Sequence, residues 1–382
     1  MVVVEKASNK LFEILSKFAI QGTVGDVEPF GSGHIHDTYH VKNLKEGEPD
    51  YLLQCINHNV FKNIPALMEN IQVVTSHLRK KLEHLSGADP EQEVLTLVST
   101  KEREWYYKDN DGSFWRVYHF IPDTFTYDVV KTAELAYEGG KAFGRFQALL
   151  ADLPVHLLHD TIPDFHNVVN RLRLYHEVLQ KDPVNRVAEV KTEIAFVEER
   201  AEAMSAIYKL GKAGKLPLRI THNDTKFNNV LLDKNDKAQC VVDLDTVMPG
   251  FVAYDFGDAI RTTINTAPED EPDLEEIQIS VDLFRGFTEG FLEETGHSLT
   301  RTEIESLSHG VLLLPFIMGL RFLTDYIDGD NYYKIHHKGH NLQRARAQFQ
   351  LVRKLEEQYD LLRDIIGEVA KNCKEVATVT SK

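Results

Sequence analysis

Cysteine is scarce in this chain of 382 residues, and the three cysteines (Cys55, Cys240 and Cys373) stand far apart. Cys55 and Cys240 fall in apolar, strand-like runs, which favours buried thiols in a reducing compartment over a disulfide framework. Positive charge is also in deficit, because 43 Lys and Arg face 59 Asp and Glu, a formal net charge of −16. This balance argues against nucleic acid or an anionic membrane as a partner of the broad surface.

Long apolar runs are missing too. The first twenty residues carry apolar side chains at helical spacing, interrupted by Glu13 and Lys17, which predicts an amphipathic helix at about residues 8–20 rather than a signal peptide. The most apolar stretch, Gly310–Leu320, is shorter than the ~20 residues of a membrane span. It contains Pro315 and predicts a kinked, buried core helix. We therefore expect a cytoplasmic protein without a membrane partner.

The most informative stretch reads THNDTKFNNVLLD and is followed by VVDLD. It places His222, Asp224 and Asn229 in an H-x-D-x-x-x-x-N pattern, and Asp243 follows a short apolar run. Phosphoryl transfer from ATP needs such a set, because the reaction depends on positioning and on neutralising charge. We assign Asp224 as the catalytic carboxylate that orients the attacking hydroxyl, and Asn229 and Asp243 as ligands of Mg²⁺. Asp245 is a candidate for a second metal position.

Two other interpretations of this stretch stay open. A loop rich in Asp and Asn before a strand is often only a turn, because these side chains satisfy local backbone groups. Three residue types at suitable offsets, flanked by apolar runs, favour the phosphotransfer interpretation. His222, Asp224 and Asp243 could also bind a hydrolytic metal, although no further His or Cys stands at short ligand spacing beside them.

These motifs resemble the catalytic core of the aminoglycoside phosphotransferase and choline kinase superfamily, which has a protein-kinase-like fold. Longer blocks are similar to the N-acetylhexosamine 1-kinases and are spread over most of the chain: Gly31–Tyr39, Asn57–Ile71, Thr221–Asp233 and Asp243–Arg261. The resemblance implies an α+β bilobal fold with a small β-rich N-terminal lobe and a larger, mainly helical C-terminal lobe. It also implies ATP as phosphoryl donor, Mg²⁺ as cofactor and a small-molecule sugar as acceptor.

The order of the predicted elements agrees with such a fold. Strand-like runs occupy 24–30, 38–41, 51–56, 94–98 and 114–120, and a helical segment occupies 64–85. Helical spacing then predicts helices over 135–150, 168–179, 187–210, 274–294, 301–327 and 341–369. We expect a nucleotide-binding lobe over residues 1–120, a catalytic and acceptor-binding lobe over residues 121–382, and a boundary near Phe120–Thr126.

The candidate phosphate loop is Gly31, Ser32 and Gly33, between the first two strand-like runs. Glycines let backbone N–H groups approach phosphate oxygens, and the serine adds a hydroxyl. A plain hairpin turn is the alternative. For adenine, the resemblance implies contacts with the hinge around Tyr118 and Phe120.

One position departs from the kinase pattern. Kinase-like small lobes usually carry a Lys on the third strand that pairs with the ATP phosphates and with a Glu on the following helix. Gln54 occupies that place here, and its amide can hydrogen-bond a phosphate but cannot neutralise it. Lys62 is a candidate substitute, with a surface Lys at the helix start as the other interpretation, and Glu69 has no evident cation. The nucleotide donor is left open.

The triplet Asp255-Phe256-Gly257 spells DFG, which marks the metal-binding Asp in protein kinases. Here it lies twelve residues after Asp243, which already follows the catalytic loop. We therefore assign Asp255, and similarly Asp258, to capping the following helix and holding the loop.

For the acceptor, the resemblance implies that the anomeric hydroxyl of an N-acetylhexosamine meets Asp224 and that His34, Arg321 and Tyr332 contact the sugar. A salt bridge from Arg321 to Asp325, four residues on, is the alternative for that arginine.

The acceptor itself has alternatives. They are choline, ethanolamine or another small alcohol, or no reaction at all, in a protein that only binds nucleotide or sugar. Thr262 stands where the resemblance would place an aromatic residue. Whether the protein is a monomer or a homodimer is not decided by the sequence.

Overall fold

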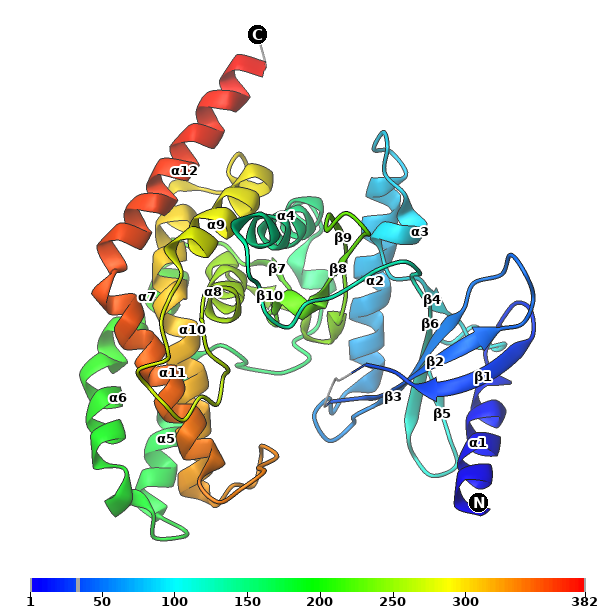
Figure 1. The fold of residues 1–382 in the computed structure, drawn as a ribbon, viewed down its shortest axis with the longest axis horizontal. Helices are drawn as coiled ribbons and strands as arrows, with labels where there is room; N and C mark the ends of the chain where they lie inside the picture. The colour runs from blue at the N-terminus through cyan, green and yellow to red at the C-terminus, as the bar shows by residue number, and fades with distance from the viewer. Residues whose placement is uncertain (1, 32–34, 381–382) are drawn as a thin grey trace.

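The structure, a computed structural model, describes residues 2–31 and 35–380. An antiparallel sheet near the N-terminus lies beside a larger part made mainly of helices (Figure 1). The helix α2 (Ile64–Leu82) lies between the two. The fold is thus the α+β class that the sequence predicts.

The sheet has six strands, with the order β1-β2-β3-β6-β4 and with β5 paired to β6. Their bounds are β1 (Val24–Pro29), β2 (Asp37–Asn43), β3 (Tyr51–Ile56), β4 (Leu97–Val98), β5 (Tyr107–Lys108) and β6 (Phe114–His119). The strand β5 was not predicted. The run predicted at 94–98 shrinks to the two strand residues of β4, and the short helix α3 (Pro90–Glu93), capped by Asp89, ends directly before this run. In the β3–β6 ladder Gln54 stands opposite Arg116, on the next strand.

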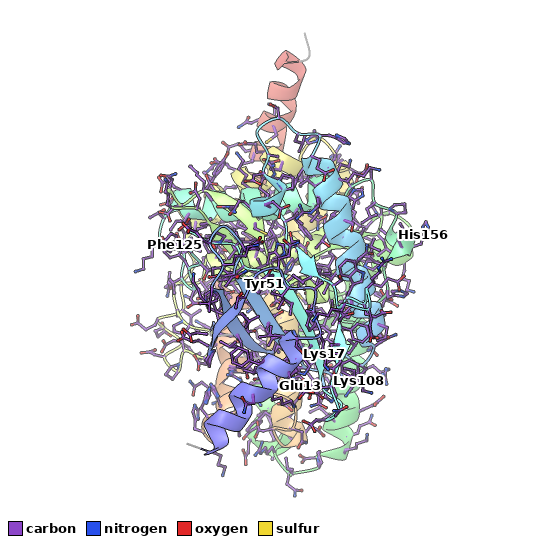
Figure 2. All side chains as sticks on the ribbon, turned by 90° about the vertical axis from the view of Figure 1, so that its right-hand side faces the viewer. Glu13, Lys17, Tyr51, Lys108, Phe125 and His156 are labelled. Atoms are coloured by element: carbon purple, nitrogen blue, oxygen red, sulfur yellow. The ribbon has the colours of Figure 1, made fainter. Side chains whose placement is uncertain are left out.

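The helix α1 (Val2–Leu15) covers the outer face of this sheet. Figure 2 shows it in front of the strands, with Glu13 labelled on the helix and Lys17 just beyond its end. The helix ends at Leu15 and not at residue 20, as predicted, because Phe18 pairs as a β-bridge with Thr100. Tertiary pairing therefore overrides the helical spacing of the apolar residues.

The inner face of the sheet packs against α2 through Leu52, Ile56 and Tyr118. The helix begins with an Asn63 side chain that accepts a hydrogen bond from the Ala66 N–H. Its buried Asn70 donates to the carbonyl oxygens of His159 and Val247 at 2.8 and 3.0 Å. The helix α2 therefore connects the sheet to the helical part.

The helical part contains α4 (Ala133–Leu149), α5 (Val168–Lys181), α6 (Lys191–Met204), α7 (Ala206–Lys212), α8 (Val252–Thr263), α9 (Val281–Thr295), α10 (Arg301–Asp328), α11 (His340–Glu357) and α12 (Tyr359–Thr380). Two predicted helices are each two helices, interrupted at Ser205 and at Gln358. The helix predicted from residue 274 begins only at Val281, under the cap of Ser280.

The helix α10 forms the centre of the helical part. Its length and apolar composition would also suit a membrane span, but 72% of its most apolar window is buried in the protein, as in a core helix. Pro315 lies inside it. The helix α8 packs tightly on α10, since a Cβ on Gly257 would come within 2.2 Å of the Gly310 carbonyl oxygen. The glycine of the DFG triplet is thus required by packing.

Two small antiparallel sheets complete the fold and carry the segments of the site. One pairs β7 (Arg219–Thr221) with β10 (Met248–Gly250), and the other pairs β8 (Val230–Leu232) with β9 (Ala238–Val241). The loop after β7 and the segment between β9 and β10 are therefore brought together. Short 3-10 turns lie at Val155–Leu157, Val187–Glu189, Phe227–Asn229 and Leu244–Thr246.

Candidate active site

The loop after β7 is held by Asp255 of the DFG triplet. Its two carboxylate oxygens accept hydrogen bonds from the backbone N–H groups of His222 and Asn223, at 2.8 and 2.7 Å. Gln147 on α4 donates a third. Burial raises the pKa of Asp255, although these donors and His222 favour its charged form. The prediction that Asp255 holds the loop agrees with this geometry, but it does not cap α8, which already begins at Val252.

Asp224 follows directly in this loop and is about a quarter exposed. Lys226 places its ammonium 3.0 and 3.2 Å from the two Asp224 carboxylate oxygens. Burial alone would raise the pKa of Asp224, but the charge and hydrogen bond of Lys226, together with the charges of His222 and Arg261, outweigh burial and hold the pKa below its ordinary value. The loop therefore presents an ionised carboxylate at neutral pH, with a cation beside it.

Asn229 ends the same loop and contacts the same residue. Its Nδ2 donates to the Asp224 carbonyl oxygen at 2.8 Å. No hydrogen bond within the described chain uses its Oδ1, so this oxygen is available to a cation.

Lys226 was not singled out in the sequence, although its place two residues after Asp224 was a usable signal.

Asp243 follows β9 with a left-handed backbone, φ 59° and ψ 57°. Its side chain is open to solvent. Nevertheless the protein atoms around its carboxyl, and then the charges of Asp245 and Asp224, raise its pKa. Three carboxylates thus stand close together. Donor atoms of His36, Asp243 and Asp245 lie within 4.8 Å of one another, and a divalent cation would relieve this repulsion.

Asp245 is buried and already has partners. Arg116 on β6 binds it with both terminal nitrogens, at 2.5 and 3.0 Å, and His36 donates to it from Nε2. The His36 Nδ1 accepts from the Asn57 N–H at 3.0 Å, which places the ring proton on Nε2. Burial opposes the charge, but Arg116 and His36 hold the pKa of Asp245 far below its ordinary range. Its role as a second metal ligand stays a prediction that must compete with these contacts.

Gln54 belongs to the same network, since its Oε1 accepts from the Arg116 Nε at 2.9 Å. Arg116 therefore supplies a cation one strand away from the expected lysine position. Lys62 is exposed and forms no ion pair among the residues that the structure describes. Glu69 is exposed too and contacts His159.

The other residues predicted to bind the nucleotide are Gly31, Ser32, Gly33, Tyr118 and Phe120. Gly31 is exposed with φ 79°, while Ser32, Gly33 and the acceptor candidate His34 lie outside the described residues. Tyr118 is buried under the guanidinium of Arg116. The backbone N–H of Phe120 donates a hydrogen bond to the Asp50 carbonyl oxygen. The roles of these residues in nucleotide binding stay predictions.

On the acceptor side, Arg321 does not pair with Asp325. The Asp325 carboxylate instead accepts from the backbone N–H groups of residues 331–333 and from Asn341. The Arg321 guanidinium lies over aromatic rings, 5.4 Å from that of Phe165 and 6.0 Å from that of Tyr332. Arg321 and Tyr332 therefore do lie together, and Tyr332 is exposed.

Asp258 and Thr262 lie on α8. Asp258 pairs with Arg261 at 2.9 Å and does not cap the helix. Its second oxygen is buried with no partner in the described chain. The Thr262 hydroxyl bonds back to the helix backbone.

The site thus combines the ionised carboxylate of Asp224 beside Lys226 with the amide oxygen of Asn229 and the carboxylate of Asp243. These groups lie where the small sheet meets the helical part, and together they are the features of a phosphotransferase. Residues 26–286 match the model of the phosphotransferase enzyme family known as APH. The chain belongs to this family.

Solved structures share the fold across nearly the whole chain. A microcompartment-associated aminopropanol kinase has a TM-score of 0.63 at 15% identity, with 92% of this chain and 98% of that chain covered. A choline kinase from Cryptosporidium parvum Iowa II has a TM-score of 0.59 at 16% identity, covering 92% and 97%. An aminoglycoside phosphotransferase from Alicyclobacillus acidocaldarius has a TM-score of 0.57 at 11% identity, covering 95% and 96%.

Proposed function

We propose that this protein is an ATP-dependent small-molecule kinase whose acceptor is the anomeric C1 hydroxyl of an N-acetylhexosamine, with the sugar 1-phosphate as product. The observation that carries the kinase assignment is the Asp224–Lys226 pair, 3.0 Å apart, on a loop shared with Asn229. Such a pair holds a hydrogen-bond acceptor for a hydroxyl next to a cation for phosphoryl oxygens.

In the proposed reaction Asp224 accepts a hydrogen bond from the acceptor hydroxyl and takes up its proton. A bond forms between that oxygen and the γ-phosphorus, while the bond from the γ-phosphorus to the β–γ bridging oxygen breaks and ADP leaves. Lys226 neutralises the transferred group. Asn229 and Asp243 are the residues that would hold Mg²⁺, which neutralises phosphate charge when bound. Their oxygen donors and the repulsion around Asp243 fit this cation.

Electrostatics favours a sugar over a quaternary amine as acceptor. Arg321 has no carboxylate partner in the described chain, and Arg171 lies close to it. A cationic acceptor would be repelled there, whereas sugar oxygens accept hydrogen bonds from a guanidinium. A small-alcohol acceptor such as choline or ethanolamine is the second candidate, because the choline kinase and the aminopropanol kinase share the fold.

The test is ADP release with Mg-ATP in the presence of N-acetylglucosamine, N-acetylgalactosamine, glucose, galactose, choline, ethanolamine or an aminoglycoside, with products identified by phosphorus NMR. We expect an anomeric phosphate from the N-acetyl sugars and its loss in Asp224→Asn. Turnover of choline alone would reject the sugar acceptor. Release of ADP that is unchanged in Asp224→Asn would reject the mechanism. No release with any acceptor or nucleotide would favour a protein that only binds.

A further inference from the structure

We propose that the acceptor carries an anionic group, such as a carboxylate, sulfate or phosphate, which binds between Arg171 and Arg321. The inference goes beyond the proposed kinase function but rests on it for the position of the acceptor hydroxyl at Asp224. It assigns to Arg171 a role in substrate specificity that the sequence did not suggest.

The two arginines come from different helices and meet at one residue. Arg171 on α5 donates to the Phe165 carbonyl oxygen from Nε and Nη2, at 3.3 and 2.9 Å. Arg321 on α10 places its guanidinium 5.4 Å from the centre of the Phe165 ring. The main chain and the ring of Phe165 therefore hold two guanidinium groups near one another.

Neither guanidinium forms an ion pair within the described residues. Arg321 contacts the ring of Tyr333 at 5.5 Å and the sulfur of Met318 at 3.5 Å, and both contacts leave its charge uncompensated. Arg173, two residues from Arg171 on the same helix, does pair with a carboxylate, Glu177. In a chain with 59 acidic and 43 basic residues, two half-buried arginines without a carboxylate need an explanation.

Their proximity has an electrostatic cost. Burial, and after it the charge of Arg321, lowers the pKa of Arg171 to about 10. An anion between the two would remove the repulsion and use the planar donor faces of both, which match carboxylate, sulfate and phosphate oxygens. The charge of Asp164 acts on Arg171 as well, but the two form no ion pair, so the donor faces of both guanidinium groups stay available to an anion.

The pair is coupled to the reaction centre through His166. This residue follows Phe165, and its ring contacts the carbonyl oxygen of Asn223, beside Asp224, at 3.0 Å from Nε2. Burial lowers the pKa of His166 to about 4, so the ring is neutral and its Nε2 carries the proton. Its buried Nδ1 has no partner in the described chain and can accept a hydrogen bond from a hydroxyl.

Two requirements on the acceptor follow. A hydroxyl must reach Asp224, and an anionic group of the same molecule must reach the two arginines. A hexuronic acid or an N-acetylhexosamine with an acidic substituent meets both requirements. Choline, ethanolamine and aminoglycosides carry the opposite charge.

Binding can be measured without turnover, by calorimetry in the presence of Mg²⁺ and a non-hydrolysable ATP analogue. The compounds are N-acetylglucosamine, its 6-sulfate and its 6-phosphate, together with glucose and glucuronic acid. We expect at least one acidic sugar to bind roughly tenfold tighter than its neutral parent, the order of one charge-assisted hydrogen-bonding contact. The substituent that increases the affinity, whether sulfate, phosphate or carboxylate, identifies the anion that the site prefers.

Three variants test whether the tighter binding of the acidic sugar depends on the arginine pair. Arg171→Gln should reduce the advantage of the acidic sugar to less than threefold, and Arg171→Lys should retain part of it. Arg173→Gln is the matched control, because this exposed arginine is on the same helix and its loss should change nothing. Melting temperatures identify any variant that fails to fold, and for such a variant Arg321→Lys takes its place.

The two proposals fail in different ways. Neutral sugars that bind as tightly as acidic ones, an advantage that survives in Arg171→Gln, or no binding of any sugar would overturn the anionic subsite. If acidic sugars bind through Arg171 but no ADP is released, the subsite stands and the kinase function is rejected. If neutral sugars are phosphorylated and bind as tightly as acidic ones, the kinase function stands and the subsite is rejected.

Discussion

Arg116 and Asp245 form a fully buried ion pair that joins the sheet to the segment after Asp243. Both side chains are 2% exposed, and the guanidinium contacts both carboxylate oxygens, at 2.5 and 3.0 Å. Because Gln54 is the cross-strand neighbour of Arg116, the cation stands beside the place where a kinase lysine is expected. The pair fixes the position of the chain that carries Asp243.

The first prediction separates the structural part of this pair from its part in nucleotide binding. Arg116→Met leaves the Asp245 charge buried without its main partner, so it should lower the free energy of unfolding by about 3–5 kcal/mol. The double variant Arg116→Met with Asp245→Asn removes both charges and should recover most of that loss. Urea denaturation measures both.

In the folded double variant we expect a raised KM for Mg-ATP and an unchanged KM for the acceptor, because the site has lost its cation next to Gln54. Adding Gln54→Lys to this double variant should lower the nucleotide KM again. A double variant with a wild-type nucleotide KM would limit Arg116 to a structural role.

Local signals in the sequence predicted much of the fold. The starts of α5 and α10 were predicted at the observed residue, where Asn167 and Thr300 cap the first turn. The breaks at Ser205 and Gln358 were missed, because the apolar spacing continues across them. Helical spacing reports the buried face and carries no information on where two helices change direction.

In the site, too, contacts within one loop were predicted from the sequence and contacts between distant segments were not. Asp224 and Asn229 share one loop, so their spacing in the sequence predicted that they would lie together. Arg116 and His36 reach Asp245 from 129 and 209 residues away, and no short pattern encodes such contacts. The cytoplasmic location and the boundary between the two lobes stay predictions.

The second prediction concerns Lys226. Lys226→Met should reduce kcat by about 100-fold, the usual cost of removing one group that stabilises charge in a transition state. It should also move the acidic limb of the kcat/KM profile to higher pH, because Lys226 holds the pKa of Asp224 down against burial. Steady-state kinetics from pH 5 to 9 measure both effects. Lys101→Met, at an exposed lysine outside the site, is the control, and equal effects of the two variants would contradict the assignment.

The third prediction tests the role of Asp255 in holding the catalytic loop. Asp255→Asn replaces one acceptor oxygen by a donor that faces backbone N–H groups of His222 and Asn223. We expect a loss of about 2–3 kcal/mol of stability, because charge-assisted hydrogen bonds are replaced by a clash of donors. Thermal denaturation measures it, with Asp26→Asn on the exposed edge of β1 as control. A metal role for the DFG triplet would instead show as a changed Mg²⁺ dependence with normal stability.

The fourth prediction follows from the burial of His166. Its pKa is lowered from 6.5 to about 4 in the folded protein, so the unfolded chain binds the proton first as the pH falls. Between pH 7 and pH 5 this residue should therefore reduce the stability by about 2 kcal/mol, and the effect is absent above pH 7. Urea denaturation of the wild type and of His166→Gln at both pH values isolates it, because the variant should lose this share of the slope. His176→Gln, at an exposed histidine, should keep the wild-type slope, and a wild-type slope in His166→Gln would show that this ring is not the group responsible.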